Sequence, residues 1–596
     1  MLDVKINRKL LPIKSHYFLF NAGTAPLMPY IPTYAKQLGI PSSGVGIMYA
    51  IFPFVGLIAK PSFGALADKF KKGKLIFILS IIFTAIFFGC IAFIPAQTTD
   101  AFMDLECNSG ETRLKTCNVT DGCALDKIEM EFQGKEIMEC KLVCYDPNYS
   151  FLEQICNAGN ISESCFSNQT HIEMTTYSNI SDSTFEQTCL YFPVKHIYFN
   201  GTDIENPQCN GASGIKCSVD CNSSTVMDYI QNAIIEQIAE PYYKTIQFQL
   251  LFFLMAGAWA AQAVVVCLSD AICFNLLGDK PHNYGAQRLW GAVGWGLMAI
   301  IAGYLIDLAS AGQLQKDYTP SFYLVVIILA INAVSVIKIK VDYHQEPYQI
   351  KKILILFKNV RVVLFLFSCI TFGICIGIVW QFQLWFLEDL ASAQGCDSLQ
   401  WIKLLQGLAM GVQCFLGEAP FLFLSGRILK KFGHVHTMTM ILVVMGIRLL
   451  AYSYLVNPWY TLPIDLLNGL TLGVYWSTMA SYANLIAPPE ATSTLQGIFG
   501  ALFEGIGTSI GSLFGGFIYE SYGGAIMFRS FGIYALVYGA IYSLSHFAMD
   551  FNKRKSLDTK NSMDDKEHEI SVKDFSNGGR VLSNYGSLVT GNTHSN

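Results

Sequence analysis

The chain alternates long apolar runs with short polar connectors, and this pattern predicts membrane-spanning helices. Each run has about 20 residues, enough for a helix to cross a hydrocarbon core of about 30 Å. We expect twelve spans, at 16–36, 44–66, 75–95, 246–272, 286–307, 319–338, 361–387, 403–425, 435–456, 462–486, 495–518 and 525–548. The longest polar stretch, 96–242, separates the third span from the fourth.

Composition agrees with a chain that lies mostly in a bilayer. Of its 596 residues, 52% are hydrophobic and 14% are charged, whereas roughly a quarter are charged in an ordinary soluble domain. The net charge of −5 gives no basic surface for nucleic acid. We find no zinc-type cluster, nucleophile elbow or nucleotide loop. We therefore expect an all-α polytopic membrane protein that binds the lipid bilayer, is not an enzyme and uses no cofactor or metal.

The basic connector 64–74, GALADKFKKGK, sets the expected orientation. Gly64 and Gly73 would allow a tight reversal between two spans. Four lysines in so short a connector place it on the cytosolic side. With twelve spans, both termini are then cytosolic. From the sequence pattern alone, a plain charged turn between two membrane helices explains this stretch equally well.

The segment 96–242 has a different composition and predicts an extracellular, disulfide-rich, N-glycosylated unit. Eleven of the 18 cysteines lie there: Cys107, Cys117, Cys123, Cys140, Cys144, Cys156, Cys165, Cys189, Cys209, Cys217 and Cys221. It also holds seven N-x-[ST] sequons, at Asn118, Asn148, Asn160, Asn168, Asn179, Asn200 and Asn222. Such a concentration is typical of a stapled unit in an oxidising compartment. An intracellular metal module is the alternative, and the sequons argue against it.

An odd number of cysteines leaves one without a partner inside this segment. Cys396, in the connector between the seventh and eighth spans, faces the same side in the expected topology. A bridge to Cys396 would staple the segment to the second half of the chain. The alternative is a free Cys396 and one exposed or dimer-forming cysteine in the segment.

These patterns divide the chain into six parts. They are the first three spans at 1–95, the extracellular unit at 96–242, spans four to six at 243–340, a cytosolic connector at 341–360, the last six spans at 361–548 and a disordered cytosolic tail at 549–596.

The connector at 64–74 resembles the signature loop of the major facilitator superfamily. The shared pattern is G-x-L-x-D-[RK], here Gly64, Leu66, Asp68 and Lys69. The stretch 426–433, GRILKKFG, repeats part of it in the second half. The resemblance implies the major facilitator fold, with two six-helix halves and a gating loop that contains Gly64, Asp68, Lys69, Gly426 and Lys431.

A second resemblance involves the fourth and fifth spans. Arg288 and Trp295 lie seven positions apart, on nearly the same helix face, and Asp270 could pair with Arg288. Structurally, Arg288 could instead extend to the membrane surface and Trp295 could lie in the aromatic belt. The stretch is similar to lactose-permease-type oligosaccharide/proton symporters, which implies that Asp270 and Arg288 bind a solute and Trp295 stacks on it. Asp270 stands where that group has glutamate.

The second half carries four charged residues inside expected spans: Glu418, Arg448, Asp465 and Glu504. A carboxylate in a desolvated pocket can take up a proton, and an arginine can stabilise its charged form. They are candidates for ion coupling, with fixed structural pairs as the alternative. The lactose-permease group has further acidic residues in the seventh span and a histidine in the tenth. Here 376–386 contains no charge and position 472 is leucine.

The run from Asp465 to Gly497 resembles the major facilitator superfamily domain-containing protein 6 family. The residues that carry this resemblance are Gly469, Thr471, Trp476, Tyr482, Pro488, Pro489, Glu490, Gln496 and Gly497, with Glu418 and Pro420 in the eighth span. It covers the twelve-span core but not 96–242 or the tail.

We therefore expect a solute carrier that works by alternating access on a small polar organic solute, sugar- or nucleoside-like by analogy, with proton coupling as an open question. Further candidates for lining the site are Trp380, Gln381, Tyr475 and Trp476. The alternative is a cell-surface receptor that binds a protein ligand through the glycosylated unit. We expect the plasma membrane, with endosomes as the alternative location.

Overall fold

The computed structural model describes most of the chain. The described residues are 9–70, 72–95, 101–107, 111–117, 128–129, 137–145, 151, 171–186, 189–199, 201–208, 213–223, 225–227, 229–230, 241–277, 284–311, 315–339, 358–487 and 492–578. All structural statements below concern these residues.

The first half consists of apolar helices, and prolines break the first of them. Its elements are α1 (Leu11–Thr24), η1 (Met28–Tyr30), α2 (Ile31–Gln37), α3 (Ser42–Phe70), α4 (Gly73–Ile91), α8 (Ile246–Leu277), α9 (Tyr284–Ala309) and α10 (Thr319–Val336). Pro29 and Pro32 stand at the starts of η1 and α2, where a missing N–H costs no helical bond. The first span therefore begins earlier than expected, at Leu11, and is interrupted.

The second half is built from longer helices with π-helical segments inside them. Its elements are α12 (Val360–Gln394), α13 (Cys396–Gln400), α14 (Ile402–Val412), η6 (Gln413–Glu418), α15 (Ala419–Ser453), η7 (Pro458–Tyr460), α16 (Thr461–Asp465), η8 (Gly469–Gly473), α17 (Val474–Ile486), α18 (Thr492–Gly500), η9 (Ala501–Gly507), α19 (Thr508–Tyr522) and α20 (Gly524–Gly578). Of these, η6, η8 and η9 are π-helical.

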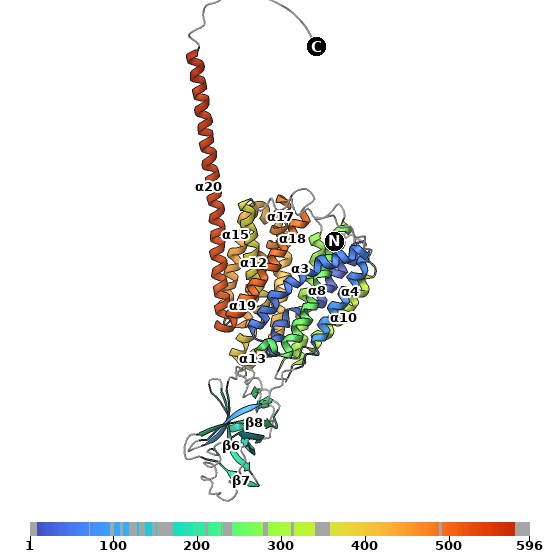
Figure 1. The fold of residues 1–596 in the computed structure, drawn as a ribbon, viewed down its shortest axis with the longest axis vertical. Coiled ribbons are helices and arrows are strands. Elements are labelled where there is room, and N and C mark those ends of the chain that lie inside the picture. The colour runs from blue at the N-terminus through green and yellow to red at the C-terminus, as the bar shows by residue number, and fades with distance from the viewer. Residues whose placement is uncertain are drawn as a thin grey trace, which may run out of the picture. The chain divides into compact units, whose positions relative to one another are not determined.

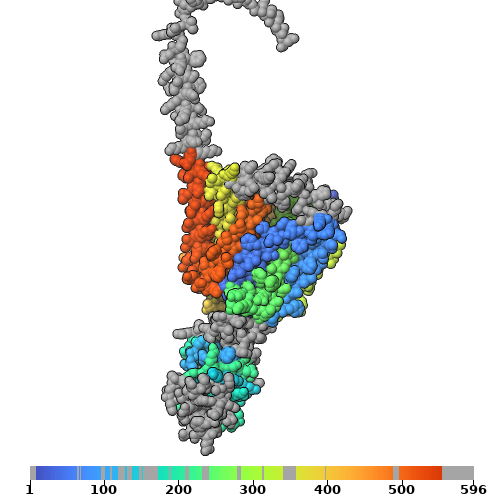
Figure 2. All heavy atoms as spheres, in the orientation of Figure 1, coloured from blue at the N-terminus to red at the C-terminus, as the bar shows by residue number. Residues whose placement is uncertain are grey.

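The two halves meet through two helix pairs. In Figure 1, α3, α4, α8 and α10 lie to one side and α12, α15, α17 and α19 to the other. Between the halves, α9 packs along α14 and η6, and α3 packs along α19. The second contact is visible in Figure 2, where blue α3 lies against orange α19.

The expectation of twelve spans is met only in part by helix length. Nine helices in the described residues are long and apolar enough to cross a membrane. The expected spans at 16–36 and 462–486 are each divided into shorter helices, and those at 403–425 and 435–456 form one stretch that kinks at Gly433. Twelve crossings stay a prediction.

The signature stretches are helical rather than loops, so the expected turn at Gly64 is wrong. Gly64, Asp68 and Lys69 lie in the last turns of α3, and Gly426 and Lys431 lie within α15. The reversals come later, between Phe70 and Gly73 in the first half and at Gly433 in the second. Gly433 has φ 71°, a left-handed conformation that glycine adopts without steric cost.

The segment 96–242 contains a β-sheet, which the all-α expectation missed. Its strands are β1 (Phe102–Cys107), β2 (Thr112–Thr116), β3 (Ile137–Tyr145), β4 (His171–Asn179), β5 (Thr184–Glu186), β6 (Cys189–Phe199), β7 (Thr202–Glu205) and β8 (Ser213–Cys221), with η2 (Ile180–Asp182) between β4 and β5 and η3 (Tyr242–Lys244) after the sheet. All pairings are antiparallel in the order β2-β1-β8-β3-β4-β6, and β2 also pairs with β6. This closes a six-stranded barrel, to which β5 and β7 add at β6.

Alternation along the barrel strands explains its core. On β3, Met138, Cys140, Leu142 and Cys144 are buried while the residues between them are not, as expected for a strand with one face inward. Buried residues of all six barrel strands form one apolar cluster. The segment therefore has a core of its own.

Disulfides cross-link the barrel, as the cysteine density predicted. Cys140–Cys221 and Cys144–Cys217 join residues that face each other on β3 and β8, and Cys117–Cys189 joins the end of β2 to the start of β6. Cys107 is also disulfide-bonded. The side chain of Cys396 and the cysteines Cys123, Cys156, Cys165 and Cys209 lie outside the described residues, so the proposed staple stays a prediction.

Two of the seven sequon asparagines are described. Asn222 follows β8 and is exposed, while Asn179 ends β4 and is half-buried. The other five lie outside the described residues. Glycosylation stays a prediction at all seven.

The last helix passes the point where we expected a tail. The chain from residue 539 onwards groups as a separate unit, and its helix α20 continues through Gly578. A disordered tail was expected from 549, but the described part of that region is helical. Residues beyond 578 lie outside the described part.

Candidate functional site

At one end of the bundle, glycines let the two halves approach at backbone distance. This end, which we call the closed end, is where α3 and α14 begin and α9 and α19 finish. A Cβ at Gly303 on α9 would clash with the backbone oxygen of Lys403, and one at Gly46 on α3 would clash with that of Ser512 on α19. Side chains larger than hydrogen therefore cannot be accommodated at these crossings without separating the helices.

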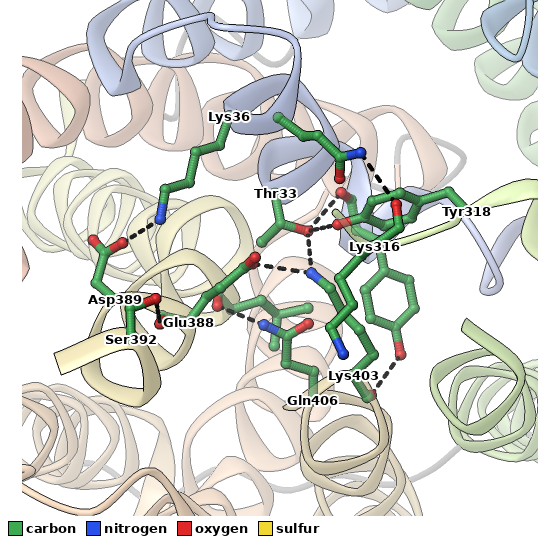
Figure 3. A network of polar contacts seen from close by, with 12 residues as sticks. Thr33, Lys36, Lys316, Tyr318, Glu388, Asp389, Ser392, Lys403 and Gln406 are labelled. Carbon is green, nitrogen blue, oxygen red and sulfur yellow. Dashed lines mark hydrogen bonds and ion pairs between the residues drawn. The ribbon is translucent and has the colours of Figure 1, made fainter. Parts of the chain in front are cut away.

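A network of ion pairs and hydrogen bonds joins the halves at the closed end (Figure 3). Lys36 on α2 forms an ion pair with Asp389 on α12 at 2.5 Å. Lys403 on α14, whose side chain is fully buried, contacts Glu388 on α12 at 3.0 Å and donates to the Thr33 hydroxyl on α2, also at 3.0 Å. We call the set Thr33, Lys36, Asp307, Lys316, Tyr318, Glu388, Asp389 and Lys403 the latch.

The remaining latch contacts centre on Asp307, near the end of α9. Its carboxylate pairs with Lys316 at 2.6 Å and accepts the Leu404 N–H of α14 at 2.7 Å. Burial lowers the pKa of the Lys316 ammonium, and the Asp307 charge opposes this effect. Tyr318 shares a hydrogen bond with Thr33, and its ring lies 5.1 Å from the Lys403 ammonium. The latch therefore has three lysines and three carboxylates drawn from both halves.

Sequence reasoning did not select the latch residues. The sequence does contain a pattern that could have indicated them. Charged residues stand at or next to the ends of expected spans on one side of the membrane, namely Lys36, Asp307, Glu388, Asp389 and Lys403. Single charges at span ends usually contact water or lipid head groups. Only packing shows that these charges face one another.

Towards the other end, the structure brings together Asp270 and Arg288, as the sequence predicted. The Arg288 guanidinium lies 3.6 Å from the Asp270 carboxylate, which also accepts a hydrogen bond from Tyr17 at 2.8 Å. Across the boundary between halves, the Arg288 guanidinium lies 5.3 Å from the ring of Trp476 on α17, a cation–π distance. Arg288 therefore connects α8 and α9 of the first half to the second half.

This pair is accessible to solvent. The side chains of Arg288 and Asp270 are 46% and 26% exposed. We predict that Asp270→Asn and Arg288→Gln each lower the free energy of unfolding by less than about 1 kcal/mol, the usual range for accessible ion pairs. Thermal unfolding of the purified variants measures this. A loss as large as that of a buried pair would show that the two charges are effectively desolvated.

Glu418 and Glu504 lie on π-helical segments of the second half, η6 and η9. Segments of this kind are frequent at functional sites. Both carboxylates interact electrostatically with Arg288. The structure thus gathers Asp270, Arg288, Glu418, Glu504 and Trp476, which we call the charged cluster.

The other candidate lining residues lie beside the cluster or apart from it. The Trp380 ring is 6.1 Å from Phe503, which precedes Glu504 and lies 5.4 Å from Trp476. Tyr475 is fully buried and its ring lies 4.8 Å from Phe503. Gln381 is buried on α12, and Trp295 is half-buried on α9.

Arg448 and Asp465 form a separate, fully buried pair. Their side chains have no exposed surface and lie 3.2 Å apart. Four further groups donate to Asp465, the amides of Gln383 and Gln413 and the hydroxyls of Thr461 and Tyr452. The four residues expected to couple ions therefore divide into this buried pair and two members of the charged cluster, Glu418 and Glu504.

Metal ligation has little support in the described ranges, where no group of three or more His, Cys, Asp or Glu residues is placed to hold an ion.

Two packed halves of apolar helices, a closed end and a charged cluster between the halves define a multi-pass membrane protein of the transporter type. A family described as "MFS_1 like family" matches residues 10–530, so the chain belongs to this family of the major facilitator superfamily. The resemblance stated from sequence is thereby confirmed.

Individual relatives agree with the family. The chain is 21% identical over 536 residues to the "Major facilitator superfamily domain-containing protein 6-like" protein of Danio rerio, covering 88% of this chain and 85% of that one. It is 23% identical to the maltose permease of Geobacillus stearothermophilus, over 49% of this chain and 70% of that one. A crystal structure of the nucleoside transporter NupG matches with a TM-score of 0.55 at 12% identity, covering 90% and 98% of the two chains. That likeness is one of fold.

Proposed function

We propose that this chain is a membrane solute carrier that works by alternating access, its halves opening at one end while they close at the other. One observation carries the proposal: the closed end is held by an interface that can be separated. Ion pairs and hydrogen bonds at the latch can be exchanged for contacts with water, because each latch residue is polar and lies either near a helix end or in the connector between α9 and α10. A permanent interface would be expected to bury apolar side chains there instead.

The solute is proposed to be a small polar organic molecule that binds at the charged cluster. Maltose permease and the nucleoside transporter NupG, by their names, act on hydroxylated solutes. Asp270 and Arg288 supply an acceptor and donors for such groups, and Trp476 supplies an aromatic face. Glu418 and Glu504 are the cluster residues that could also take up a proton.

Orientation and location are part of the proposal. The lysine-rich signature at the end of α3 is proposed to be cytosolic, as are both termini, and the barrel extracellular. The closed end would then face outwards. We propose the plasma membrane as the site of action, with endosomes as the alternative.

A reversible cross-link at the latch tests the carrier proposal. Lys36→Cys and Asp389→Cys, bridged by a short reducible bis-thiosulfonate reagent, would hold the closed end shut. In proteoliposomes loaded with a defined mixture of polar solutes, we expect at least one solute to cross with the parent protein. The bridged variant should stop this entry, and reduction should restore it, as followed by mass spectrometry of the vesicle contents.

The control is Lys36→Cys alone with the same reagent, which cannot bridge. The parent treated with the reductant shows the effect of opening the barrel disulfides. The receptor alternative predicts that no solute crosses in any state. Entry that continues through the bridged protein would contradict alternating access.

A further inference from the structure

Negative charge exceeds positive charge in the charged cluster. It holds three carboxylates, Asp270, Glu418 and Glu504, and Arg288 is the cation that acts on all three. Lys60 on α3 lies nearby and acts on Cys267, one turn before Asp270. Even with Lys60 counted, the carboxylates outnumber the cations by three to two.

The carboxylates that Arg288 does not pair with closely are those of Glu418 and Glu504. Arg288 is already engaged by Asp270 at 3.6 Å and by the Tyr284 hydroxyl at 2.8 Å. Within the described part of the chain, neither glutamate side chain forms a hydrogen bond or a close ion pair. By contrast, Asp465 on the same half has every oxygen occupied by donors. Both glutamates are half-buried, and a carboxylate between membrane helices without a fixed donor has its charge available to a ligand.

Aromatic faces lie beside these carboxylates. Phe503 immediately precedes Glu504, and its ring centre is 5.4 Å from Trp476 and 6.1 Å from Trp380. Trp380 is 40% exposed. Aromatic faces can pack against uncharged rings, and they also attract organic cations electrostatically. The combination of unpaired carboxylates and aromatic rings favours a cation over an uncharged solute.

An independent polar group on α12 also lacks a donor. Gln381, adjacent to Trp380, is 4% exposed, and its side-chain Oε1 accepts no hydrogen bond in the described part of the chain. A protonated amine donates N–H hydrogen bonds to acceptors, whereas a quaternary ammonium has no N–H and interacts through its charge with carboxylates and aromatic faces.

We propose that the solute of this carrier is an organic cation, held through a protonated amine or quaternary ammonium by Glu418 and Glu504 and by the aromatic faces of Trp380, Phe503 and Trp476. The inference rests on the proposed carrier function and narrows its substrate class. Arg288, paired with Asp270, then holds the polar remainder of the solute. An anionic solute would meet the excess negative charge and be excluded.

Binding of size-matched probes to the purified full-length protein tests this inference. Tyramine is a cation at neutral pH, tyrosol is its uncharged analogue and 3-(4-hydroxyphenyl)propionate is its anionic analogue, while choline is a cation without a ring. Because a ligand that binds only the folded state raises the unfolding temperature, we expect tyramine or choline to raise it. Tyrosol and the propionate should not do so at equal concentration and ionic strength.

Variants identify the groups responsible. Glu418→Gln and Glu504→Gln preserve side-chain size, and each should weaken the apparent affinity for the stabilising cation by at least about tenfold, because a charge-assisted contact is lost. The control is Glu173→Gln at an exposed position of β4, which makes the same chemical change away from the cluster. It should bind as the parent does.

Selectivity in the parent decides the inference even where a variant fails to fold. The inference would be overturned if tyrosol stabilised the protein as much as tyramine, or if neither tyramine nor choline stabilised it. Unchanged cation affinity in both glutamate variants would also overturn it. A carrier of neutral solutes would still pass the cross-linking experiment at the latch while failing this one. The two proposals are therefore separately testable.

Discussion

Replacing Asp465 with asparagine is expected to destabilise the protein by about 3–5 kcal/mol, the cost of removing one partner from a buried ion pair. The carboxylate and the Arg448 guanidinium have no exposed surface. Without the negative charge, Arg448 would keep the hydrogen bond to Asn468 at 2.8 Å but lose its counter-ion. Arg448→Gln should cost a similar amount, because Asp465 would then be the uncompensated charge.

The double variant Asp465→Asn with Arg448→Gln tests the coupling. Because both charges are removed together, we expect it to be less destabilised than the sum of the single variants by at least about 1 kcal/mol, as for contacting residues in general. Thermal unfolding of the purified proteins measures all three, with Glu173→Gln as a surface control. Additive losses would mean that the two residues act independently, and a stable Asp465→Asn would show that the pair does not stabilise the fold.

Replacing Lys403 with glutamine is expected to open the closed end. Lys403 is fully buried between Glu388 and Thr33, so its loss leaves a carboxylate without its nearest cation, a change worth several kcal/mol in a buried setting. The open state, in which water hydrates Glu388, does not bear this cost. The balance between states should therefore move towards opening at this end by at least tenfold, or about 1.4 kcal/mol.

A buried reporter on α19 measures this opening. Ser512 has no exposed surface and lies at the crossing of α3 and α19. In a Ser512→Cys background, Lys403→Gln should raise the rate of maleimide labelling at position 512 at least about tenfold, followed by peptide mass spectrometry. Lys141→Gln, at an exposed position of β3, removes the same charge elsewhere and is the control. An unchanged labelling rate in Lys403→Gln would show that the latch does not hold the closed end shut.

The sequence by itself determined the features that depend on local composition. Apolar run length predicted most helices within a few residues, since crossing a hydrocarbon core requires a minimum helix length. Cysteine density predicted the cross-linked unit, and the spacing of Asp270, Arg288 and the signature motifs predicted both the family and one ion pair. Strand content was missed, because short strands between cysteines carry a weaker pattern than a membrane helix.

Only the tertiary structure decided which charges meet. In the sequence, four charged residues look alike as isolated charges in apolar runs: Glu418, Arg448, Asp465 and Glu504. In the structure, Arg448 and Asp465 pair with each other, whereas Glu418 and Glu504 lack hydrogen-bond donors in the described part of the chain. The difference lies in Gln383, Gln413 and Tyr452, which reach Asp465 from other elements, and in Thr461 on the same helix. The latch depends in the same way on α2, α12 and α14 packing at one end. Such contacts join residues far apart in the chain, and the pattern of one apolar run contains no information about its neighbours.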